Sequence, residues 1–587
     1  MQYFMLARLI GMGIAMVSMV SAADRPNIVL VMTDDQGYGD FGATGNALIK
    51  TPELDAMAQR SASWEEFYVS PVCSPTRACL MTGRYNHRTK CIDTFLGRSM
   101  MASDEVTLAE VLQDNGYATG IFGKWHLGDN YPMRPSDQGF SYSLIHKGGG
   151  LGQPADPRDN KARYTNALLF ENDREVETEG YSTDVFFDHS FEFMEQSKKA
   201  GKPFFAYVSL NAPHSPFHDV PQGLYEKYQK VDFSPIMVLD EGKDQAKEND
   251  KLARIAAMIT NIDDNMGKLF KKLSDMGLSD DTIVIFLTDN GPNTRRFVGP
   301  FRGKKSELYE GGVRTPLWIQ WPKVLKPGSQ IKKSVAAHID LMPTLLDACG
   351  VKEVPNGMDG RSVLEKLKNP EVELEQRPIV IQYHRGDEIS KYHSCMVRLG
   401  KWKLVHPSGT QKTKFEGEPK WELYDLAADP GETKDLIGVE KEVAATLIAR
   451  YESWYKDVSG ARADQPGPPY IVVEKDKENP SVLTWQDMIE GTWRPNKVGY
   501  YKVEFTQDGR YDIRCEAALG YKLKKDEKWT AKLELGGKEY STPFNPETGI
   551  GVFEALSIPA GRYTLKTKIV SEGGEEWVVY HTRILHR

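Results

Sequence analysis

A short stretch of the chain combines a thiol, a proline and an arginine in a spacing that suits anion chemistry. Cys73 is followed by Ser74 and Pro75, and Arg77 lies one helical turn beyond the cysteine. Serine is favoured as an N-cap and proline at the first helical position, and Gly83 supplies a helix stop. We therefore expect the thiol at the start of a short helix, where free backbone N–H groups and the Arg77 guanidinium would hold an oxyanion.

Acidic and amide side chains follow two apolar runs elsewhere in the chain. Asp34 and Asp35 come directly after the first run, and Asp289 and Asn290 come directly after another. Such a set offers oxygen ligands alone and suits a hard divalent cation, of which calcium is the better match because several carboxylates and an amide gather. Taken singly, each pair could instead cap a helix or form a turn.

Four short apolar runs of this kind end in polar clusters, and helical patterns lie between them. The runs are Asn27–Thr33, Tyr117–Phe122, Pro203–Leu210 and Thr282–Thr288. Their continuous Val, Ile and Phe content is typical of strands buried on both faces of a parallel sheet. The helical patterns are Pro52–Arg60, Leu108–Asn115 and Lys251–Met276. This alternation predicts an α/β fold, a large mixed or parallel sheet sandwiched by helices, whose ligands bind beyond the carboxyl ends of the strands.

The thiol stretch and the acidic pairs together resemble the type I sulfatases of the alkaline phosphatase superfamily. The family signature Cys-x-Pro-x-Arg is met by CSPTR, with Thr76 where the family usually has serine. In that family the cysteine is oxidised to formylglycine, an aldehyde that hydrates to a gem-diol. The resemblance therefore implies formylglycine at Cys73. It also implies one calcium ion held by Asp34, Asp35, residue 73, Asp289 and Asn290.

Three further stretches resemble family blocks that supply the remaining catalytic groups. GKWHLG matches a block whose Lys and His contact the formylglycine and the sulfate, which implies those roles for Lys124 and His126. APHSPF matches the segment whose His faces the leaving oxygen, which is His214 here. FRGKKSELYEGGVRTP matches the block whose sulfate-binding Lys lies five residues before the Glu of Glu-Gly-Gly. That residue is Lys305.

By the same resemblance, one hydroxyl of hydrated residue 73 attacks sulfur and releases the alcohol, and the second then expels sulfate. A sulfate monoester repels nucleophiles, so its site must gather positive charge from the cation, Arg77, Lys124 and Lys305. The departing sugar alkoxide also needs an acid, and acid–base catalysis contributes roughly 10²–10⁴-fold. We assign proton transfer at the diol to His126 and protonation of the leaving oxygen to His214, and the sequence leaves the reverse assignment open.

Length and composition limit the other classes of function. The chain has 587 residues, of which 40% are apolar and 27% charged, and its formal net charge is −8. Two or three domains are expected at this length. Nucleic-acid binding has no electrostatic support because basic residues are not in excess.

Changes in composition and hydrophobic pattern along the chain predict four parts. These are a signal peptide over 1–23, a catalytic domain over 24–377, a smaller α/β subdomain over 378–460 and a β-sandwich-like module over 466–587. The last boundary rests on a Pro/Gly linker, ADQPGPPY, after which short alternating runs with turn residues begin. The family resemblance extends to about residue 455 and does not include the predicted β-sandwich-like module.

The N-terminal residues have the features of an export signal. Arg8 precedes the apolar run Leu9–Val20, and small residues follow. The predicted localisation is secreted or periplasmic, and no membrane span is expected because this run is short and no second one follows. Six cysteines do not make a disulfide scaffold at this length, although Cys79 and Cys91 could form one bridge.

The favoured function is hydrolysis of sulfate esters on a sulfated oligosaccharide or polysaccharide, with a formylglycine-generating or sulfatase-maturating enzyme as partner. One alternative is a phosphonate or phosphodiester hydrolase of the same superfamily. Another is a non-catalytic sulfoglycan-binding protein in which Cys73 stays a thiol. Candidates for the pocket wall, each as well explained as loop surface, are His146-Lys147, Arg295-Arg296 and Tyr383-His384-Arg385.

Overall fold

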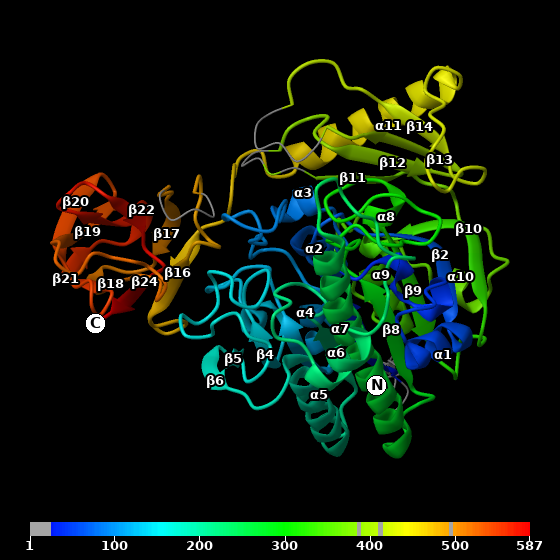
Figure 1. Ribbon diagram of the computed structural model, residues 1–587, viewed down its shortest axis with the longest axis horizontal. Coiled ribbons are helices and arrows are strands. Elements are labelled where there is room, and N and C mark those ends of the chain that lie inside the picture. Colours follow the sequence, from blue (N-terminus) through cyan, green and yellow to red (C-terminus); the bar gives the residue numbers. More distant parts are fainter. Residues whose placement is uncertain (1–24, 384, 386–388, 409–414, 492–496) are drawn as a thin grey trace, which may run out of the picture.

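A ten-stranded mixed sheet forms the centre of the molecule (Figure 1). The computed structural model describes residues 25–383, 385, 389–408, 415–491 and 497–587, so the expected signal peptide over 1–23 lies outside the described residues. The strand order is β10-β2-β9-β8-β1-β7-β3-β4-β5-β6. The bounds are β1 Asn27–Thr33, β2 Ala62–Tyr68, β3 Ala118–Lys124, β4 Tyr142–His146, β5 Leu168–Glu171, β6 Arg174–Glu177, β7 Phe204–Ser209, β8 Thr282–Thr288, β9 Arg314–Gln320 and β10 Gln330–Ala337.

The middle of this sheet is parallel and buried on both faces, as the continuous apolar runs predict. Strands β8, β1, β7, β3 and β4 pair in parallel, while β9, β5 and β6 run antiparallel to their neighbours. All residues of β1, β7 and β8 are buried. Side chains of β1 alternate between two apolar clusters, with Leu30 in one and Val31 in the other, because successive strand residues face opposite ways.

Helices cover both faces of the sheet. One face is covered by α1 (Pro52–Arg60), α5 (Ser182–Lys199) and α7 (Gln245–Asp275), and the other by α2 (Cys73–Thr82), α4 (Leu108–Asp114), α9 (Leu341–Ala348) and α10 (Leu364–Lys368). The shorter elements are η2 Tyr38–Asp40, η3 Gly42–Thr44, α3 Asn86–Thr89, η4 Pro135–Gln138, α6 Gln222–Tyr228, α8 Glu310–Val313 and η5 His338–Asp340. Two strands and α1 have the bounds expected from sequence, whereas α7 begins before the expected Lys251.

The start of α2 differs from the sequence prediction. Ser74 is not the N-cap: Val72 occupies that position in extended backbone, and Cys73 is the first helical residue. Pro75 therefore lies at the third helical position, where its missing N–H still costs no intrahelical bond. Gly83 ends the helix as expected, in the left-handed region at φ 65°.

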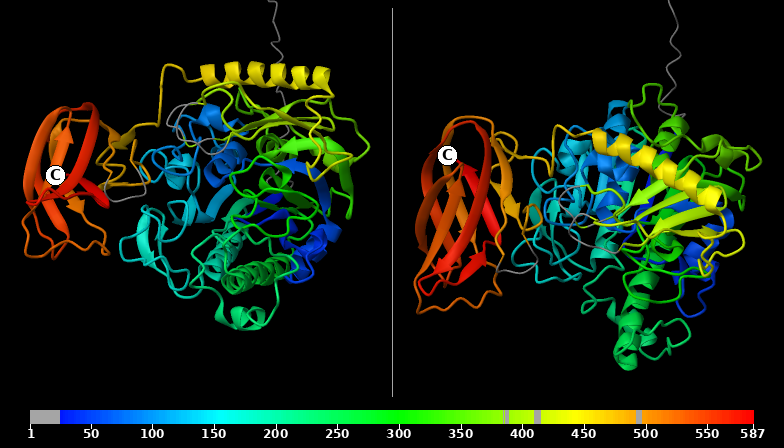
Figure 2. Two further views of the ribbon diagram at one scale, coloured as in Figure 1. Left: turned by 45° about the horizontal axis from the view of Figure 1, so that its top comes forward. Right: turned by 90° about the horizontal axis from the view of Figure 1, so that it is seen from above.

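A second, four-stranded sheet packs on the main domain. It comprises β11 (Ile379–Gln382), β12 (Cys395–Leu399), β13 (Trp402–His406) and β14 (Glu422–Asp425), and all its pairings are antiparallel. One face holds α11 (Lys441–Gly460), visible along the top in the left view of Figure 2, and the other joins the apolar cluster of the main domain. This unit is an antiparallel sheet followed by one helix, within the smaller α/β subdomain expected over 378–460.

The C-terminal strands form two further sheets that face each other across an apolar core (Figure 1, red and orange). One contains β15 Ile471–Val473, β17 Tyr501–Phe505, β19 Trp529–Leu535, β20 Lys538–Phe544, β22 Gly561–Ser571 and β23 Glu576–Val578. The other contains β16 Ser481–Thr484, β18 Gly509–Glu516, β21 Ile550–Ile558 and β24 His581–His586. We call residues 471–587 the β-module. Trp529 is buried in its core, and Trp485 and Trp577 are partly buried against it.

Two further sequence expectations concern cysteines and membranes. All six cysteines lie within the described ranges and are buried free thiols, so the bridge considered between Cys79 and Cys91 is not formed. Along the part of the chain that the structure covers, no helix combines the length and apolarity that crossing a membrane requires.

Candidate active site

The carboxyl ends of the central strands bring the predicted site residues to one edge of the sheet. Thr33 of β1 and Thr288 of β8 are register partners, so Asp34 and Asp289, which follow them, emerge side by side. On the other side of β1, Ser209 of β7 pairs with Gly123, the residue before Lys124. Parallel pairing thus gathers segments that are far apart in the sequence.

Helix α2 delivers the thiol to the same edge and is fastened there by two of its own side chains. Thr76 Oγ1 donates to the carbonyl of Asp289 at 2.7 Å. Arg77 donates from Nη2 to Asp289 Oδ2 at 2.8 Å and from Nη1 to the hydroxyl of Ser209 and the carbonyl of Lys124. Cys73 Sγ and one carboxylate oxygen each of Asp34 and Asp289 lie within 4.8 Å of one another, as a shared ligand set requires.

Two lysines complete the positive side of the cluster. Lys305 Nζ lies 3.4 Å from Cys73 Sγ and 2.6 Å from Asp35 Oδ1. Lys124 Nζ lies 2.5 Å from Asp34 Oδ2 and donates to the carbonyl of Gly149 at 2.6 Å. Together with Arg77, these cations surround the thiol and would hold an anion placed against it.

The two predicted histidines face this cluster from different segments. His214 donates from Nδ1 to its neighbour's carbonyl, that of Ser215, at 2.7 Å, and its Nε2 lies 3.7 Å from Asp35 Oδ2. His126 Nε2 lies 2.7 Å from the carbonyl oxygen of Thr94, so this nitrogen carries the proton and donates.

A glycine run lies against the two imidazoles, and sequence reasoning missed it. A Cβ at Gly149 would lie 2.8 Å from Cε1 of His126, and one at Gly150 would lie 2.9 Å from Cε1 of His214. A side chain at either position would collide with an imidazole ring. The glycine run Gly148–Gly150 is therefore the sequence feature that could have indicated this contact. Ser209, which accepts from Arg77, was missed because a lone serine within an apolar run has no distinguishing pattern.

Burial and crowding shift the acids and bases of the site. Burial acts to raise the pKa of Asp34, but the positive charges of Lys124, Lys305 and Arg77 outweigh it and hold this pKa well below its usual value. Burial and the neighbouring charge of Asp34 raise the pKa of Asp289 to about 7. Burial and Asp34 also raise the pKa of the Cys73 thiol to about 11. A thiol in this environment is neutral near pH 7 and is not an activated nucleophile by itself.

Both histidines are held in the neutral form. Burial and the charge of Lys124 keep the pKa of His126 well below 6.5. Burial also lowers the pKa of His214, although Asp34 and Asp35 oppose that shift. At neutral pH each imidazole therefore has one nitrogen able to accept a proton.

Unpartnered oxygens mark where a cation fits. Among the described residues, Asp34 Oδ1, Asp35 Oδ2 and Asn290 Oδ1 are buried and accept no hydrogen bond. Leaving such groups buried without a partner is costly, and Asp34 and Asp35 add like charges. A hard divalent cation bound by oxygen would satisfy all three atoms, so the residues present fit calcium.

Backbone strain is concentrated at the same place. Asp35, His126 and Ser306 have φ values of 61°, 59° and 70°, in the left-handed region that non-glycine residues rarely adopt. Each such residue costs on the order of 1–3 kcal/mol unless its surroundings impose the conformation. The strain here aims the carboxylate of Asp35 and the ring of His126 into the cluster.

Most of the proposed pocket-wall residues have structural partners. Lys147 donates to the carbonyl of Asp129 at 3.0 Å. His146 differs: it is buried as the register partner of Lys124, and neither of its ring nitrogens has a hydrogen-bond partner in the described structure. Arg296 is buried against Asp40 at 2.6 Å. Lys147 and Arg296 thus hold neighbouring segments together.

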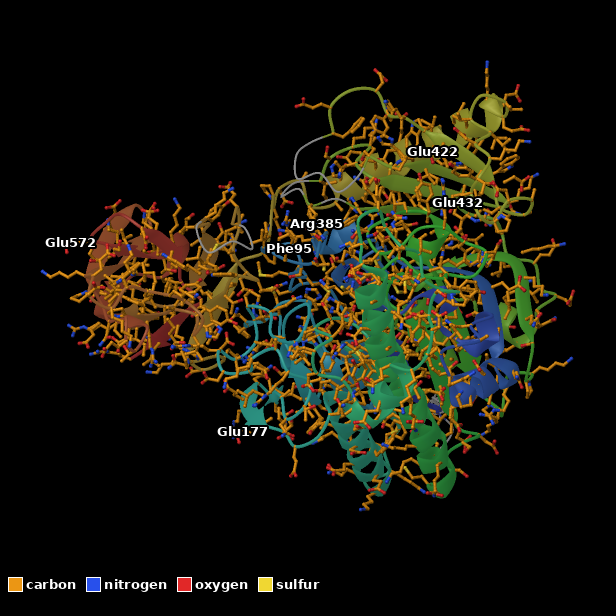
Figure 3. The ribbon with its side chains drawn as sticks, viewed as in Figure 1. Phe95, Glu177, Arg385, Glu422, Glu432 and Glu572 are labelled. Carbon is orange, nitrogen blue, oxygen red and sulfur yellow. The ribbon has the colours of Figure 1, made fainter. Side chains whose placement is uncertain are left out.

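Of the remaining wall candidates, Arg295 forms an ion pair near the surface, and Arg385 lies near the thiol. Arg295 is half exposed and pairs with Glu307 at 3.0 Å. Arg385 donates from Nε to Tyr383 at 2.7 Å, lies 5.3 Å from the ring of Phe95 (Figure 3), and is near enough to Cys73 for the two to interact electrostatically. His384 lies outside the described residues.

Comparison with known families and proteins matches most of the chain. A family model described as sulfatase matches residues 26–351, and one described as N-sulphoglucosamine sulphohydrolase, C-terminal, matches residues 302–456. An ulvan-active sulfatase of Formosa agariphila is 30% identical over 425 residues, covering 70% of this chain and 77% of that protein. Arylsulfatase A of Homo sapiens is 30% identical over 470 residues, covering 72% and 86%.

A solved structure shares the fold. The crystal structure of Ps i-CgsB in complex with k-i-k-neocarrahexaose superposes with a TM-score of 0.63 at 26% identity, and the match covers 75% of this chain and 94% of that one.

Proposed function

The chain belongs to the sulfatase family, and from this premise we propose that it removes sulfate from a sulfated carbohydrate by means of formylglycine at position 73 and one calcium ion. The observation that carries the proposal is the cluster of Cys73, Asp34 and Asp289, with ligand atoms within 4.8 Å. Three buried oxygens without partners in the described structure and three surrounding cations belong to the same cluster.

Calcium would be held by Asp34, Asp35, Asp289 and Asn290 together with residue 73. When bound, it supplies charge neutralisation for the sulfate and lowers the pKa of a coordinated hydroxyl. The ion pairs Lys124–Asp34 and Lys305–Asp35 orient these carboxylates.

We propose that residue 73 acts after conversion of its thiol to the aldehyde, whose hydrate supplies an oxygen nucleophile. The neutral, buried thiol would be a poor nucleophile. Lys305 Nζ lies 3.4 Å from Cys73 Sγ, and Arg77 and Lys124 belong to the same cluster. These three cations would bind the sulfate oxygens and offset their repulsion of the nucleophile.

Each of the two histidines has one ring nitrogen that donates to a backbone carbonyl and one that can accept a proton, and we propose a different role for each. His126 donates from Nε2 to Thr94, which leaves the lone pair on Nδ1, so we propose that His126 accepts the proton from the hydrated side chain. His214 donates from Nδ1 to Ser215, so its Nε2, near Asp35, carries a proton only in the imidazolium form; we propose that Nε2 takes up a proton and gives it to the leaving oxygen, which returns the ring to the neutral form.

The names of the relatives support a saccharide as substrate. The Formosa relative is named as active on ulvan, and Ps i-CgsB was solved with a neocarrahexaose. We propose an oligosaccharide from a sulfated polysaccharide as the substrate class. Arg385, beside Phe95 and Tyr383, is the wall residue that we propose to face the sugar. We also propose export, on the apolar run Leu9–Val20.

The test is to produce the chain with a sulfatase-maturating enzyme and to measure two things. Peptide mass at residue 73 should show loss of sulfur and gain of an aldehyde. Sulfate release should be seen from at least one member of a panel of sulfated galactan, ulvan, glycosaminoglycan and fucan oligosaccharides, with turnover of an aryl sulfate exceeding that of the matching aryl phosphate. Preference for the phosphate would favour the phosphodiester alternative. An intact thiol in protein from the native host would leave only sulfoglycan binding.

A further inference from the structure

The β-module is docked against the loops on either side of His126. Phe95, Leu96, Met100 and Met133 of the catalytic domain belong to the same apolar cluster as the core of the module. Backbone and side-chain hydrogen bonds add to this contact. Val472 N donates to the carbonyl of Tyr131 at 3.1 Å, and Tyr131 N donates to Glu478 Oε2 at the same distance. In Figure 1 the module lies beside the loops around β4 and α3.

One side chain of the module reaches the predicted catalytic histidine. Gln486 is 2% exposed and follows β16 in a short turn. Its Nε2 lies 2.7 Å from the carbonyl oxygen of Thr94, 2.7 Å from Ser99 Oγ and 3.2 Å from His126 Nε2. Its backbone carbonyl accepts from Gly97 N at 2.7 Å, which fixes the turn to the same loop.

The carbonyl of Thr94 is therefore shared by two donors from two parts of the molecule. His126 Nε2 and Gln486 Nε2 both lie 2.7 Å from it. This contact keeps the proton of the imidazole on Nε2. Within the described structure, Nδ1 is buried and has no hydrogen-bond partner, so its lone pair is free to accept. The ring also sits on a backbone with φ 59°, which must be held by its neighbours.

We propose that Gln486 is a positioning residue and that the β-module completes the active site through it. The amide fixes the carbonyl of Thr94, and that carbonyl fixes the tautomer and the orientation of His126. The inference rests on the proposed sulfatase function. Neither family model extends beyond residue 456, so neither includes this contact.

The alternative is that Gln486 merely helps to dock the module. The two roles differ in what they predict for catalysis. A docking residue would affect stability, and other docking residues would act in the same way. A positioning residue would change turnover and the tautomer of His126, while binding of the sulfate by Lys124, Lys305 and Arg77 would persist.

The experiment compares Gln486→Met with Glu478→Gln in the full chain carrying formylglycine. Methionine keeps the length of the side chain and removes the amide. Glu478→Gln weakens the contact to Tyr131 at the same interface and does not touch His126. We expect Gln486→Met to lower kcat for an aryl sulfate about 10–100-fold, the size of effect seen when groups that orient catalytic ligands are removed, with KM within about twofold. Glu478→Gln should leave kcat within about twofold.

A second readout does not depend on turnover. Spectra of protein labelled with ¹⁵N-histidine distinguish a protonated Nε2 from a protonated Nδ1, and His126→Gln identifies the signal. We expect the native chain to show His126 protonated at Nε2 and Gln486→Met to show a mixture or the other tautomer. Should Gln486→Met fail to fold, Ser99→Ala, which removes the hydroxyl that orients the amide, should show a smaller change in the same direction.

Three results would overturn the inference: an unchanged kcat in Gln486→Met, an unchanged His126 signal, or equal losses in Gln486→Met and Glu478→Gln. These are distinct from failure of the proposed function, in which the native chain itself would release no sulfate from any ester.

Discussion

Two buried clusters of charge lie close together in this molecule, and they differ in how completely their atoms are paired. In the second cluster Glu310, from α8, accepts from Lys403 at 2.8 Å and from Tyr68 at 2.9 Å, and Arg314 lies 3.2 Å away. Glu432 accepts from the backbone of Glu310 at 2.7 Å and lies 2.9 Å from Lys403. We call these five residues the Glu310 cluster.

The Glu310 cluster joins the main sheet to the antiparallel sheet of β11–β14. Three of its four carboxylate oxygens accept a hydrogen bond, and the fourth, Glu432 Oε1, lies 2.9 Å from Lys403 Nζ. In the cluster around Cys73, three buried oxygens accept no hydrogen bond in the described structure. A paired cluster needs nothing more and holds two parts of the fold together, whereas an unpaired one is complete only with a ligand. Burial and charge alone therefore do not identify a functional site; the cluster around Cys73 is distinguished by three gathered ligand oxygens that accept no hydrogen bond.

The largest effect should come from the thiol. We expect Cys73→Ala to reduce sulfate release by at least about 10³-fold, because removing a nucleophile leaves only binding and electrostatic effects. The free energy of unfolding should change by no more than about 1 kcal/mol. Cys79→Ala, a buried thiol in the same helix, is the matched control and should keep activity. Residual turnover above one tenth of native in Cys73→Ala would contradict the assignment.

The Glu310 cluster should respond in the opposite way. We expect Lys403→Met to lower the free energy of unfolding by about 3–5 kcal/mol, because it leaves Glu310 and Glu432 buried without their cation. The folded fraction should keep its kcat. Lys401→Met, two residues away in an exposed pair with Asp425, should cost at most about 1 kcal/mol. Urea denaturation followed by fluorescence measures both, and equal losses would remove the contrast between the clusters.

Calcium should stabilise the native state by binding at the cluster around Cys73 and not at the Glu310 cluster. At a free concentration of one hundred times its Kd, the ion should add about 2.7 kcal/mol to the native state, which chelation would remove together with activity. Thermal melts with and without calcium should show this shift in the native chain and in Lys403→Met. Asp35→Asn, which lacks one ligand charge, should show little of it, and an undiminished shift in that variant would place the ion elsewhere.

The smallest effect concerns a neutral group beside both clusters. His338 is buried, accepts from Ile339 N at Nδ1 and contacts Ser70 through Nε2, and burial lowers its pKa to about 3. Below pH 6.5 the His338 side chain binds a proton in the unfolded chain, whereas in the folded chain it stays neutral until the pH approaches 3. Stability is therefore lost as pH falls from 6.5 towards 3, at about 1.4 kcal/mol per pH unit.

We expect His338→Asn to reduce the slope of the unfolding free energy against pH by the contribution of one proton, about 1.4 kcal/mol per pH unit. Unfolding curves measured between pH 6 and 4 would show this. The same slope in variant and native chain would mean that His338 titrates normally. The loss of activity in acid should be unaffected by this substitution, because it follows the site residues.

Local patterns in the sequence were sufficient to predict β1, β8 and α1 with their observed bounds. A strand buried on both faces needs an unbroken apolar run, and a helix with proline in its first turn has a defined start. Patterns also led to Cys73, Arg77 and the four oxygen ligands, and the family resemblance led to Lys124, His126, His214 and Lys305. The fold brings all of them to one edge. Their catalytic and metal-binding roles stay predictions. The start of α2 was misplaced because Ser74 has the chemistry of an N-cap without its backbone conformation.

What the sequence by itself determined is which segments bury themselves and which chemical groups follow them, since burial and turn formation depend on neighbours a few residues apart. Only the tertiary structure decided which groups meet. It paired Thr33 with Thr288, made the sheet of β11–β14 antiparallel, closed the Glu310 cluster and brought Gln486 to His126, 360 residues away in the chain. Such contacts depend on strand register and domain docking, which arise from the packing of whole surfaces and leave no short pattern in the chain.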